Sequence, residues 1–123
     1  MGTMRALLDT NILIDYLNGI DTAREEIERY RAPLISLVSW MEVMVGATPE
    51  EEPVVRAFLQ QFELVPVDAS VAELAVRIRR EHRMRLPDAI VWASAQVRSA
   101  LLVTRNTKDF SPDVPGVREP YRL

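Results

Sequence analysis

The stretch Arg5-Ala6-Leu7-Leu8-Asp9-Thr10-Asn11-Ile12-Leu13 decides the start of the fold. Residues 6–8 form a short apolar run, which predicts a buried strand over residues 5–8. Residues 9–11 are polar, and the apolar positions that follow have helical spacing, which predicts a helix ending near Asn18-Gly19. A buried strand that passes directly into a helix is typical of a parallel sheet, whose strands are joined by helical crossovers.

The same alternation continues along the chain. Further strands are expected at 34–36, 63–67 and 101–104, with a short fifth strand at Val117. Further helices are expected to begin at Asp21 or Thr22, at Ser36 or Ser39, at 48–50, at Asp68 and at Leu86. This order predicts one α/β domain over residues 1–123, with three α/β/α layers and a central, mainly parallel sheet of four to five short strands.

Composition narrows the class of protein. The chain has 123 residues and no cysteine, which excludes disulfides, thiol catalysis and cysteine-ligated zinc. No apolar run reaches the roughly 20 residues that span a bilayer, so no membrane partner is expected. The strand-like run begins at Arg5, which predicts no signal peptide and a cytoplasmic location. The net charge of −3 argues weakly against broad nucleic-acid binding.

Three acids occur inside or beside apolar runs: Asp9, Glu42 and Asp88. An ionised carboxylate in apolar surroundings costs several kcal/mol or more unless something compensates it. A shared divalent metal ion is the simplest compensator, because no Lys or Arg lies inside those runs. Ligands of parallel α/β sheets bind at the carboxyl ends of the strands, so we expect the three acids to converge there.

Each acid also has a structural interpretation. Asp9 is a suitable helix N-cap, and Asp88 can offset the dipole of the helix it opens. Glu42 has apolar neighbours at helical spacing, so a purely structural role is harder to assign. One metal site explains all three acids, whereas capping explains two. Asp15 lies six residues beyond Asp9 and is expected on another helix face, exposed or bonded to the backbone.

Two further segments carry candidate chemistry. In Val103–Phe110, the side chains of Thr104, Asn106 and Asp109 follow an expected strand end and either reach the same edge or form an Asx turn. Between residues 77 and 85, five arginines and the single histidine accompany one acid. That cluster is either a solvated helix end, where cations suit the dipole, or a surface that contacts phosphates or a partner.

Four segments, in this order, closely resemble the motifs of the PIN-domain family, and within it the VapC toxins of toxin–antitoxin pairs. They are Leu7–Leu17, Ser36–Val43 followed by Gly46, Leu86–Ala95 and Leu102–Phe110. Together they span nearly the whole chain. The resemblance implies an α/β/α fold with a parallel sheet and endoribonuclease activity that depends on Mg2+ or Mn2+. It also implies a homodimer and a cognate antitoxin as partners.

Matched position by position, Asp9, Glu42 and Asp88 correspond to the family's acidic triad. Asp9 and Asp88 are the expected metal ligands, and Glu42 is expected to hold a water and help take its proton. The expected supporting residues are Thr10, Asn11, Ser39, Thr104, Asn106 and Asp109. Asn106 stands where the family often has a fourth acid, and Asp109 is a partial substitute. The expected RNA contacts are Arg77, Arg80, Arg83 and Arg105.

Alternatives remain at this point. Asn106 in place of an acid fits a PIN-like interaction protein that has lost catalysis. Thr104 and Lys108 near the end of an α/β domain also fit a phospho-acceptor receiver module. Transfer, ribosomal and messenger RNA all remain possible substrates. An apolar groove lined by the first helices and Trp40 is a candidate surface for the antitoxin, and Met41, Met44 and Trp92 are candidates for a dimer contact or for the core.

Overall fold

The computed structural model describes residues 5–123. Within that range it has five strands and six helices, in the order β1 (Ala6–Leu8), α1 (Thr10–Leu17), α2 (Asp21–Glu28), β2 (Leu34–Ser36), α3 (Leu37–Val45), α4 (Glu52–Leu59), β3 (Glu63–Val65), α5 (Ala69–His82), α6 (Leu86–Val97), β4 (Leu101–Val103) and β5 (Val117–Arg118). Residues 1–4, on which the signal-peptide expectation depends, lie outside the described residues.

The strands of residues 5–123 form one sheet in the order β3-β2-β1-β4-β5, and every neighbouring pair is parallel. The strand order therefore reverses at β1, which has β2 on one side and β4 on the other. In such a sheet, ligands bind at the carboxyl ends of the strands beside the reversal. A receiver module has the order 2-1-3-4-5, so this topology excludes the receiver alternative.

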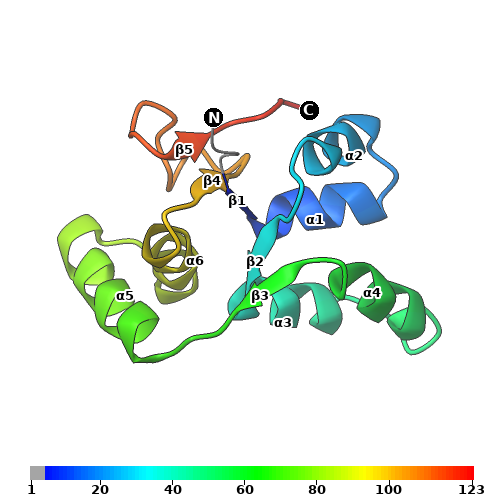
Figure 1. Ribbon diagram of the computed structural model, residues 1–123, viewed down its shortest axis with the longest axis horizontal. Coiled ribbons are helices and arrows are strands. Elements are labelled where there is room, and N and C mark those ends of the chain that lie inside the picture. The colour runs from blue at the N-terminus through cyan, green and yellow to red at the C-terminus, as the bar shows by residue number, and fades with distance from the viewer. Residues whose placement is uncertain (1–4) are drawn as a thin grey trace.

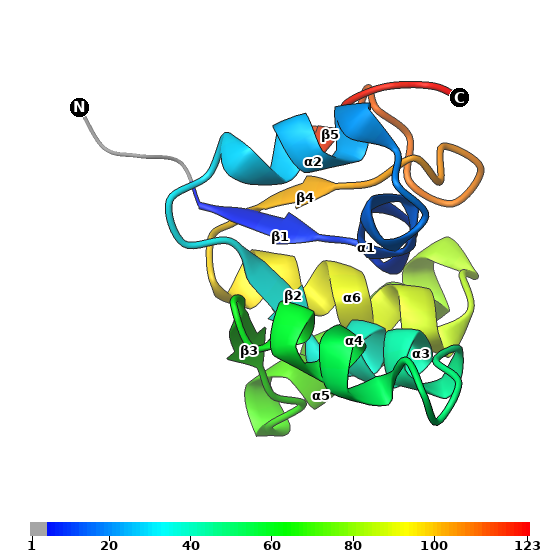
Figure 2. The same cartoon turned by 90° about the vertical axis from the view of Figure 1, so that its right-hand side faces the viewer.

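Helices cover both faces of the sheet, as the alternating pattern predicts. Helices α5 and α6 lie on one face, and α1, α2 and α4 lie on the other (Figures 1 and 2). Helix α3 begins directly at the end of β2 and contacts α1, α4 and α6. Short buried strands between two helical layers confirm the predicted α/β/α architecture.

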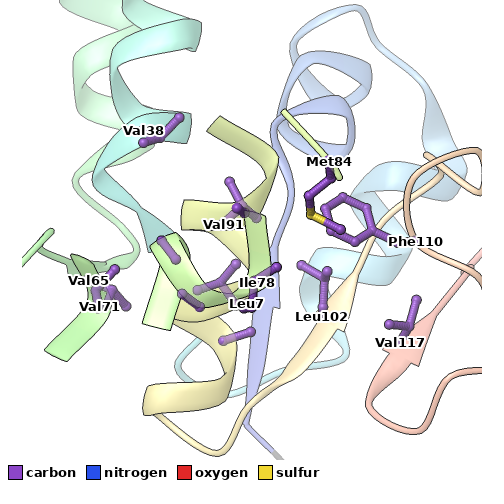
Figure 3. Close-up of a cluster of buried hydrophobic side chains, with 14 of the residues drawn as sticks. Leu7, Val38, Val65, Val71, Ile78, Met84, Val91, Leu102, Phe110 and Val117 are labelled. Carbon is purple, nitrogen blue, oxygen red and sulfur yellow. The ribbon is translucent and has the colours of Figure 1, made fainter. Parts of the chain in front are cut away.

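Side chains alternate between two hydrophobic cores along β1, β2 and β4, because successive residues of a strand point to opposite faces. Leu7, Leu34 and Leu102 belong to the core beneath α5 and α6, which also contains Met84 and Phe110 (Figure 3). Ala6, Leu8, Ile35 and Val103 belong to the core beneath α1 and α4. Burying one such large side chain stabilises the fold by roughly 1.5–3 kcal/mol, so both layers are firmly attached.

Most element boundaries fall within a few residues of their predicted places. The α2 N-cap is Ile20, without a side-chain cap, and Asp21 is already in the first turn. Helix α4 spans Glu52–Leu59, slightly later than the predicted start at 48–50. Thr48 and Glu51 form the reciprocal bonds between side chain and backbone of a capping box in the turn just before it. Strand β3 ends at Val65. Every helix in residues 5–123 is too short or too polar to cross a lipid bilayer.

Candidate functional site

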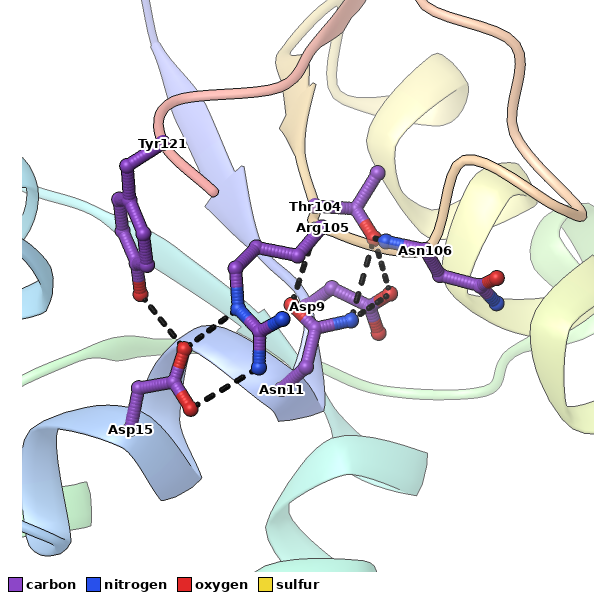
Figure 4. A network of polar contacts seen from close by, with 7 residues as sticks. All are labelled: Asp9, Asn11, Asp15, Thr104, Arg105, Asn106 and Tyr121. Atoms are coloured by element: carbon purple, nitrogen blue, oxygen red, sulfur yellow. Dashed lines mark hydrogen bonds and ion pairs between the residues drawn. The ribbon is translucent and has the colours of Figure 1, made fainter. Parts of the chain in front are cut away.

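Asp9 lies at the carboxyl end of β1, beside the reversal in strand order, and is 5% exposed. It is the N-cap of α1, and its Oδ1 accepts a hydrogen bond from Thr10 N at 2.7 Å. Its Oδ2 accepts from Thr104 Oγ1 at 2.8 Å and from Asn11 Nδ2 at 3.2 Å (Figure 4). Burial raises the pKa of Asp9 above the ordinary value, the charge of Glu42 raises it further, and the hydrogen bonds oppose the rise.

Glu42 reaches the same place from α3. Thr10 Oγ1 lies 2.7 Å from Glu42 Oε1 and 2.8 Å from Ser39 Oγ. A carboxylate can only accept, so the single hydroxyl proton of Thr10 points to Glu42, and Ser39 can donate its own proton to Thr10. The backbone of Thr10 binds Asp9 while its side chain binds Glu42, so this residue connects two of the three acids.

The expectation that Glu42 lies in apolar surroundings is wrong. Glu42 is exposed, and so are two apolar neighbours on α3, Met41 at 45% and Val45 at 86%. The prediction assumed that the apolar residues of this helix face the core. Instead α3 buries Val38 and Val43 and leaves apolar side chains in solvent beside the acid.

Asp88 is in the first turn of α6, and its side chain is 16% exposed. Burial, and then the charges of Asp9, Asp109 and Glu42, raise the pKa of Asp88 to about 6. Arg85 opposes the rise, with its Nε 3.8 Å from Asp88 Oδ2. Asp9 at the end of β1, Glu42 on α3 and Asp88 on α6 therefore lie close enough together at one edge of the sheet for their charges to interact.

The loop after β4 completes this edge. Thr104 is fully buried, donates to Asp9 and accepts a hydrogen bond from Asn106 N at 2.9 Å. Asn106 Nδ2 then donates to Asp109 Oδ2 at 2.9 Å. Asp109 is exposed, and its charge acts on Asp88. The segment is therefore both a turn built on Asn106 and part of the acidic edge, so both interpretations of it hold.

The chemistry of these groups fits a hard divalent cation. Within residues 5–123, no three His, Cys, Asp or Glu side chains are already grouped so that they could hold a metal ion. Mg2+ commonly takes only one or two carboxylates and keeps several waters, so a pair of carboxylates is sufficient. Asp9 accepts three hydrogen bonds, and a carboxylate has about four acceptor sites. A position for a cation therefore remains on Asp9 as well as on Asp88.

The predicted RNA contacts fall into two groups. Arg77 and Arg80 are exposed on α5, and Arg83 is the exposed C-cap of that helix, with φ +55°. Arg105 is different, because it is paired with Asp15 through Nε–Oδ2 at 2.6 Å and Nη2–Oδ1 at 3.0 Å. At least two of its five N–H donors are therefore already engaged.

The prediction for Asp15 is wrong. Asp15 is 5% exposed and accepts from Arg105 and from Tyr121 Oη at 2.8 Å (Figure 4). These partners lie 90 and 106 residues away in the sequence, so no local pattern could have indicated them.

Arg85 was also missed as the nearest positive charge to Asp88, although its place three residues earlier is a usable signal.

A groove of about 510 Å3 lies beside the acidic edge, between α1, α3 and α4. Its walls include Ile14, Leu17, Val43 and Val54, with Glu42 and Glu51 also among the lining residues. Trp40, predicted for this wall, is not part of it and instead packs on the core with Arg56 over its ring at 5.5 Å. Met44 and Trp92 also pack against the cores, whereas Met41 is exposed.

Comparison with known proteins adds independent information. The model of the PIN domain family matches residues 6–111. A chain in a toxin–antitoxin complex from Klebsiella pneumoniae is 44% identical, with a TM-score of 0.91 over 96% of this chain and 99% of that chain. No match was found among curated proteins.

More distant solved structures share the same fold. A chain of DNA-bound VapBC from Salmonella typhimurium is 26% identical, with a TM-score of 0.76, and the match covers 94% of this chain and 96% of that chain. A chain of FitAcB from Neisseria gonorrhoeae is 22% identical, with a TM-score of 0.79 over 96% of this chain and 99% of that chain. At 22% identity, the second likeness concerns the fold alone.

Proposed function

The chain belongs to the PIN-domain family, and on that premise we propose that it is a metal-dependent endoribonuclease and the toxin of a toxin–antitoxin pair. Its reaction is the hydrolysis of RNA phosphodiester bonds by water, in the cytoplasm. The observation that carries the proposal is the group of mutually repelling carboxylates of Asp9 at the end of β1, Glu42 on α3 and Asp88 on α6, beside the reversal in strand order. Such a group is costly without a cation and suited to one with it.

Asp9 and Asp88 are the residues proposed to hold Mg2+ or Mn2+. When bound, the metal would lower the pKa of a water and offset charge that develops on the phosphate oxygens. Glu42 is the only exposed member of the three acids, so it can approach a water from the solvent side. Its hydrogen bond from Thr10 fixes the carboxylate, so that it can accept a proton from such a water.

RNA binding requires positive charge near this acidic edge. Arg85 adjoins Asp88, and Arg77, Arg80 and Arg83 extend the positive charge along the end of α5. These side chains are proposed to contact backbone phosphates. Contacts of this kind position the substrate but do not distinguish one sequence from another. Transfer, ribosomal and messenger RNA remain equal candidates, because all three present the same backbone.

An antitoxin is the proposed protein partner, since the 44% identical chain is part of a toxin–antitoxin complex. The groove beside Glu42 combines apolar walls with the carboxylates of Glu42, Glu50 and Glu51. It therefore suits a partner segment with apolar and basic side chains. A homodimer remains a proposal from family resemblance.

The test is cleavage of purified transfer, ribosomal and messenger RNA by the isolated chain, with Mg2+ or Mn2+ and with EDTA. We expect cleavage that EDTA abolishes, and that Asp88→Asn abolishes in the presence of metal. Asp21→Asn is the matched control, because Asp21 is an exposed first-turn acid of α2, away from the acidic edge. Equal loss in both variants would contradict the assignment.

A second candidate is a PIN-like interaction protein without catalysis, because an amide, Asn106, replaces an acid at this edge. This candidate predicts antitoxin binding with no metal-dependent cleavage of any of the three RNA classes. The same assay, run with a wide range of metal concentrations, separates the two candidates.

A further inference from the structure

Arg105 occupies a special position in the loop after β4. The residue before it, Thr104, binds Asp9, and the residue after it, Asn106, binds Thr104 through its backbone N–H. Its own guanidinium points away from these groups, toward Asp15 on α1 (Figure 4). The loop that completes the acidic edge is therefore attached to α1 by a side chain that does not itself touch the acids of that edge.

The attachment has two points on one face of α1. Arg105 N donates to Asn11 Oδ1 at 3.1 Å, and its guanidinium forms the bidentate ion pair with Asp15. Asn11 and Asp15 are four residues apart, so they lie one above the other on the same helix face. Asn11 also donates to Asp9 and contacts Thr104 Oγ1 at 3.2 Å. A shift of Arg105 would therefore move two of the three groups that bind Asp9.

We propose that Arg105, clamped by Asp15 and Tyr121, is a positioning residue that fixes Thr104 and Asn11 against the carboxylate of Asp9. The inference rests on the proposed nuclease function, and it assigns Arg105 a role other than RNA contact. The Arg105 side chain is 27% exposed and that of Asp15 is 8% exposed, so solvent competes little for the pair. Tyr121 gives Asp15 a third donor and joins the end of the chain to the same clamp.

The fork of an arginine is essential to this arrangement. Nε and Nη2 of Arg105 each bind a different oxygen of Asp15, which sets both the distance and the rotation of the loop. A lysine would keep the charge but offer a single rotating ammonium, and so would not fix the rotation. Residues that orient metal-binding carboxylates typically change metal affinity or activity about 10- to 100-fold when altered.

The chain contains a matched control for this clamp. Arg118 binds Glu26 through Nε–Oε2 at 2.8 Å and Nη2–Oε1 at 3.0 Å, and Tyr30 Oη donates to Glu26 Oε2 at 2.6 Å. The two clamps thus have the same chemistry and similar exposure, with Glu26 at 5% and Arg118 at 34%. The second clamp joins β5 to α2 and contacts none of the acids at the site.

The experiment compares two charge-neutral double variants, Asp15→Asn with Arg105→Gln, and Glu26→Gln with Arg118→Gln. Neutral pairs avoid leaving a buried charge unpaired, and Arg105→Lys is a third, milder variant. For each we would measure kcat and KM on RNA, Mn2+ affinity by calorimetry, thermal stability and amide hydrogen exchange. We expect the first double variant to lower kcat and Mn2+ affinity about 10- to 100-fold with little change in KM. The second should lower only thermal stability.

Hydrogen exchange gives a readout that does not depend on catalysis. The amides of Arg105 and Asn106 donate to Asn11 and Thr104, so their exchange should accelerate in the first double variant and in Arg105→Lys, but not in the control. If the amides of Arg105 and Asn106 exchange at the wild-type rate in the first double variant, the proposal is overturned, even if the protein proves not to be a nuclease. A raised KM with kcat retained and full rescue by Arg105→Lys would instead identify Arg105 as an RNA contact. Equal losses of kcat and Mn2+ affinity in both double variants would show that the clamp has only a structural role.

Discussion

Carboxylates at the two edges of the sheet have opposite surroundings, which shift their pKa values in opposite directions. At the amino edge, Glu63 at the start of β3 is bound by Arg5 and Arg98, each at 2.7 Å, and these hydrogen bonds lower the pKa of Glu63. At the carboxyl edge, Asp88 has one arginine at 3.8 Å, while three other acids act on it, and its pKa rises to about 6. The two arginines that neutralise Glu63 lie at the amino edge, whereas Asp88 has only the more distant Arg85.

This difference separates an acid that stabilises the fold from acids that serve a ligand. Neutralised acids hold elements together, and Glu63 joins β3 to the residues before β1 and after α6. The mutual repulsion of neighbouring acids opposes folding, and such groups persist where a bound cation can compensate the repulsion. The predictions below test whether the two edges really divide in this way.

The largest difference is expected in catalysis. Asp9→Asn and Asp88→Asn should each lower RNA cleavage by about a thousandfold, because they remove charge where the metal and the reacting phosphate are stabilised. Glu63→Gln should leave cleavage unchanged, since its carboxylate lies at the opposite edge. The measurement is the single-turnover cleavage rate with saturating Mg2+. Comparable losses at both edges would contradict the division.

Metal binding should stabilise the folded protein through the carboxyl edge alone. A ligand that binds only the native state at a thousand times its Kd adds about 4 kcal/mol to the free energy of unfolding. Thermal melts with and without Mn2+ should therefore show a clear rise in Tm for the wild type and for Glu63→Gln. Asp88→Asn should abolish most of that rise. A rise of equal size in all three proteins would place the bound metal elsewhere.

The dependence of stability on pH should have opposite signs at the two edges. Asp88 has a folded pKa of about 6, above the ordinary 3.8, so the folded state binds more protons in that interval and loses stability as the pH rises through it. The loss is about 2–3 kcal/mol in metal-free protein. The pKa of Glu63 is lowered, so its contribution is present above the ordinary pKa and lost as the pH falls.

Denaturant unfolding of metal-free protein between pH 4 and pH 7 tests this prediction. Asp88→Asn should flatten the decline above pH 4 and should be more stable than the wild type at pH 7. Asp9→Asn should gain less stability at pH 7 than Asp88→Asn. The amide has a single acceptor oxygen, whereas the carboxylate of Asp9 accepts from Thr10, Asn11 and Thr104. If the wild type and Asp88→Asn have the same dependence of stability on pH over this interval, the pKa of Asp88 is not raised.

The sequence is sufficient to predict the layers and the convergence of Asp9 and Asp88, because both follow from local rules. Apolar runs of three or four residues between helical patterns specify buried parallel strands, and parallel strands bring their carboxyl ends together. The exposure of Glu42 did not follow, since apolar neighbours normally indicate burial and α3 departs from that rule beside the groove.

Long-range pairing accounts for the other failures. The clamp of Asp15 by Arg105 and Tyr121 depends on which elements become neighbours in the fold. No single segment of the sequence specifies the order of the strands in the sheet. Asn106 shows the intermediate case. Its place at the edge was predictable from the strand before it, whereas its hydrogen bond to Asp109, which holds an acid near Asp88, required coordinates.

The smallest expected effect concerns that last pair. Asp109→Asn removes a charge that raises the pKa of Asp88, so the pKa of Asp88 should fall below about 6 while cleavage declines only a few-fold. NMR titration of the Asp88 carboxyl in metal-free protein measures the shift, and Asp113→Asn, at an exposed acid of the following loop, is the control. If Asp109 substitutes for a fourth acid, Asn106→Asp should restore the activity of Asp109→Asn. Failure of that restoration would mean that Asn106 acts through its amide and that three acids are enough.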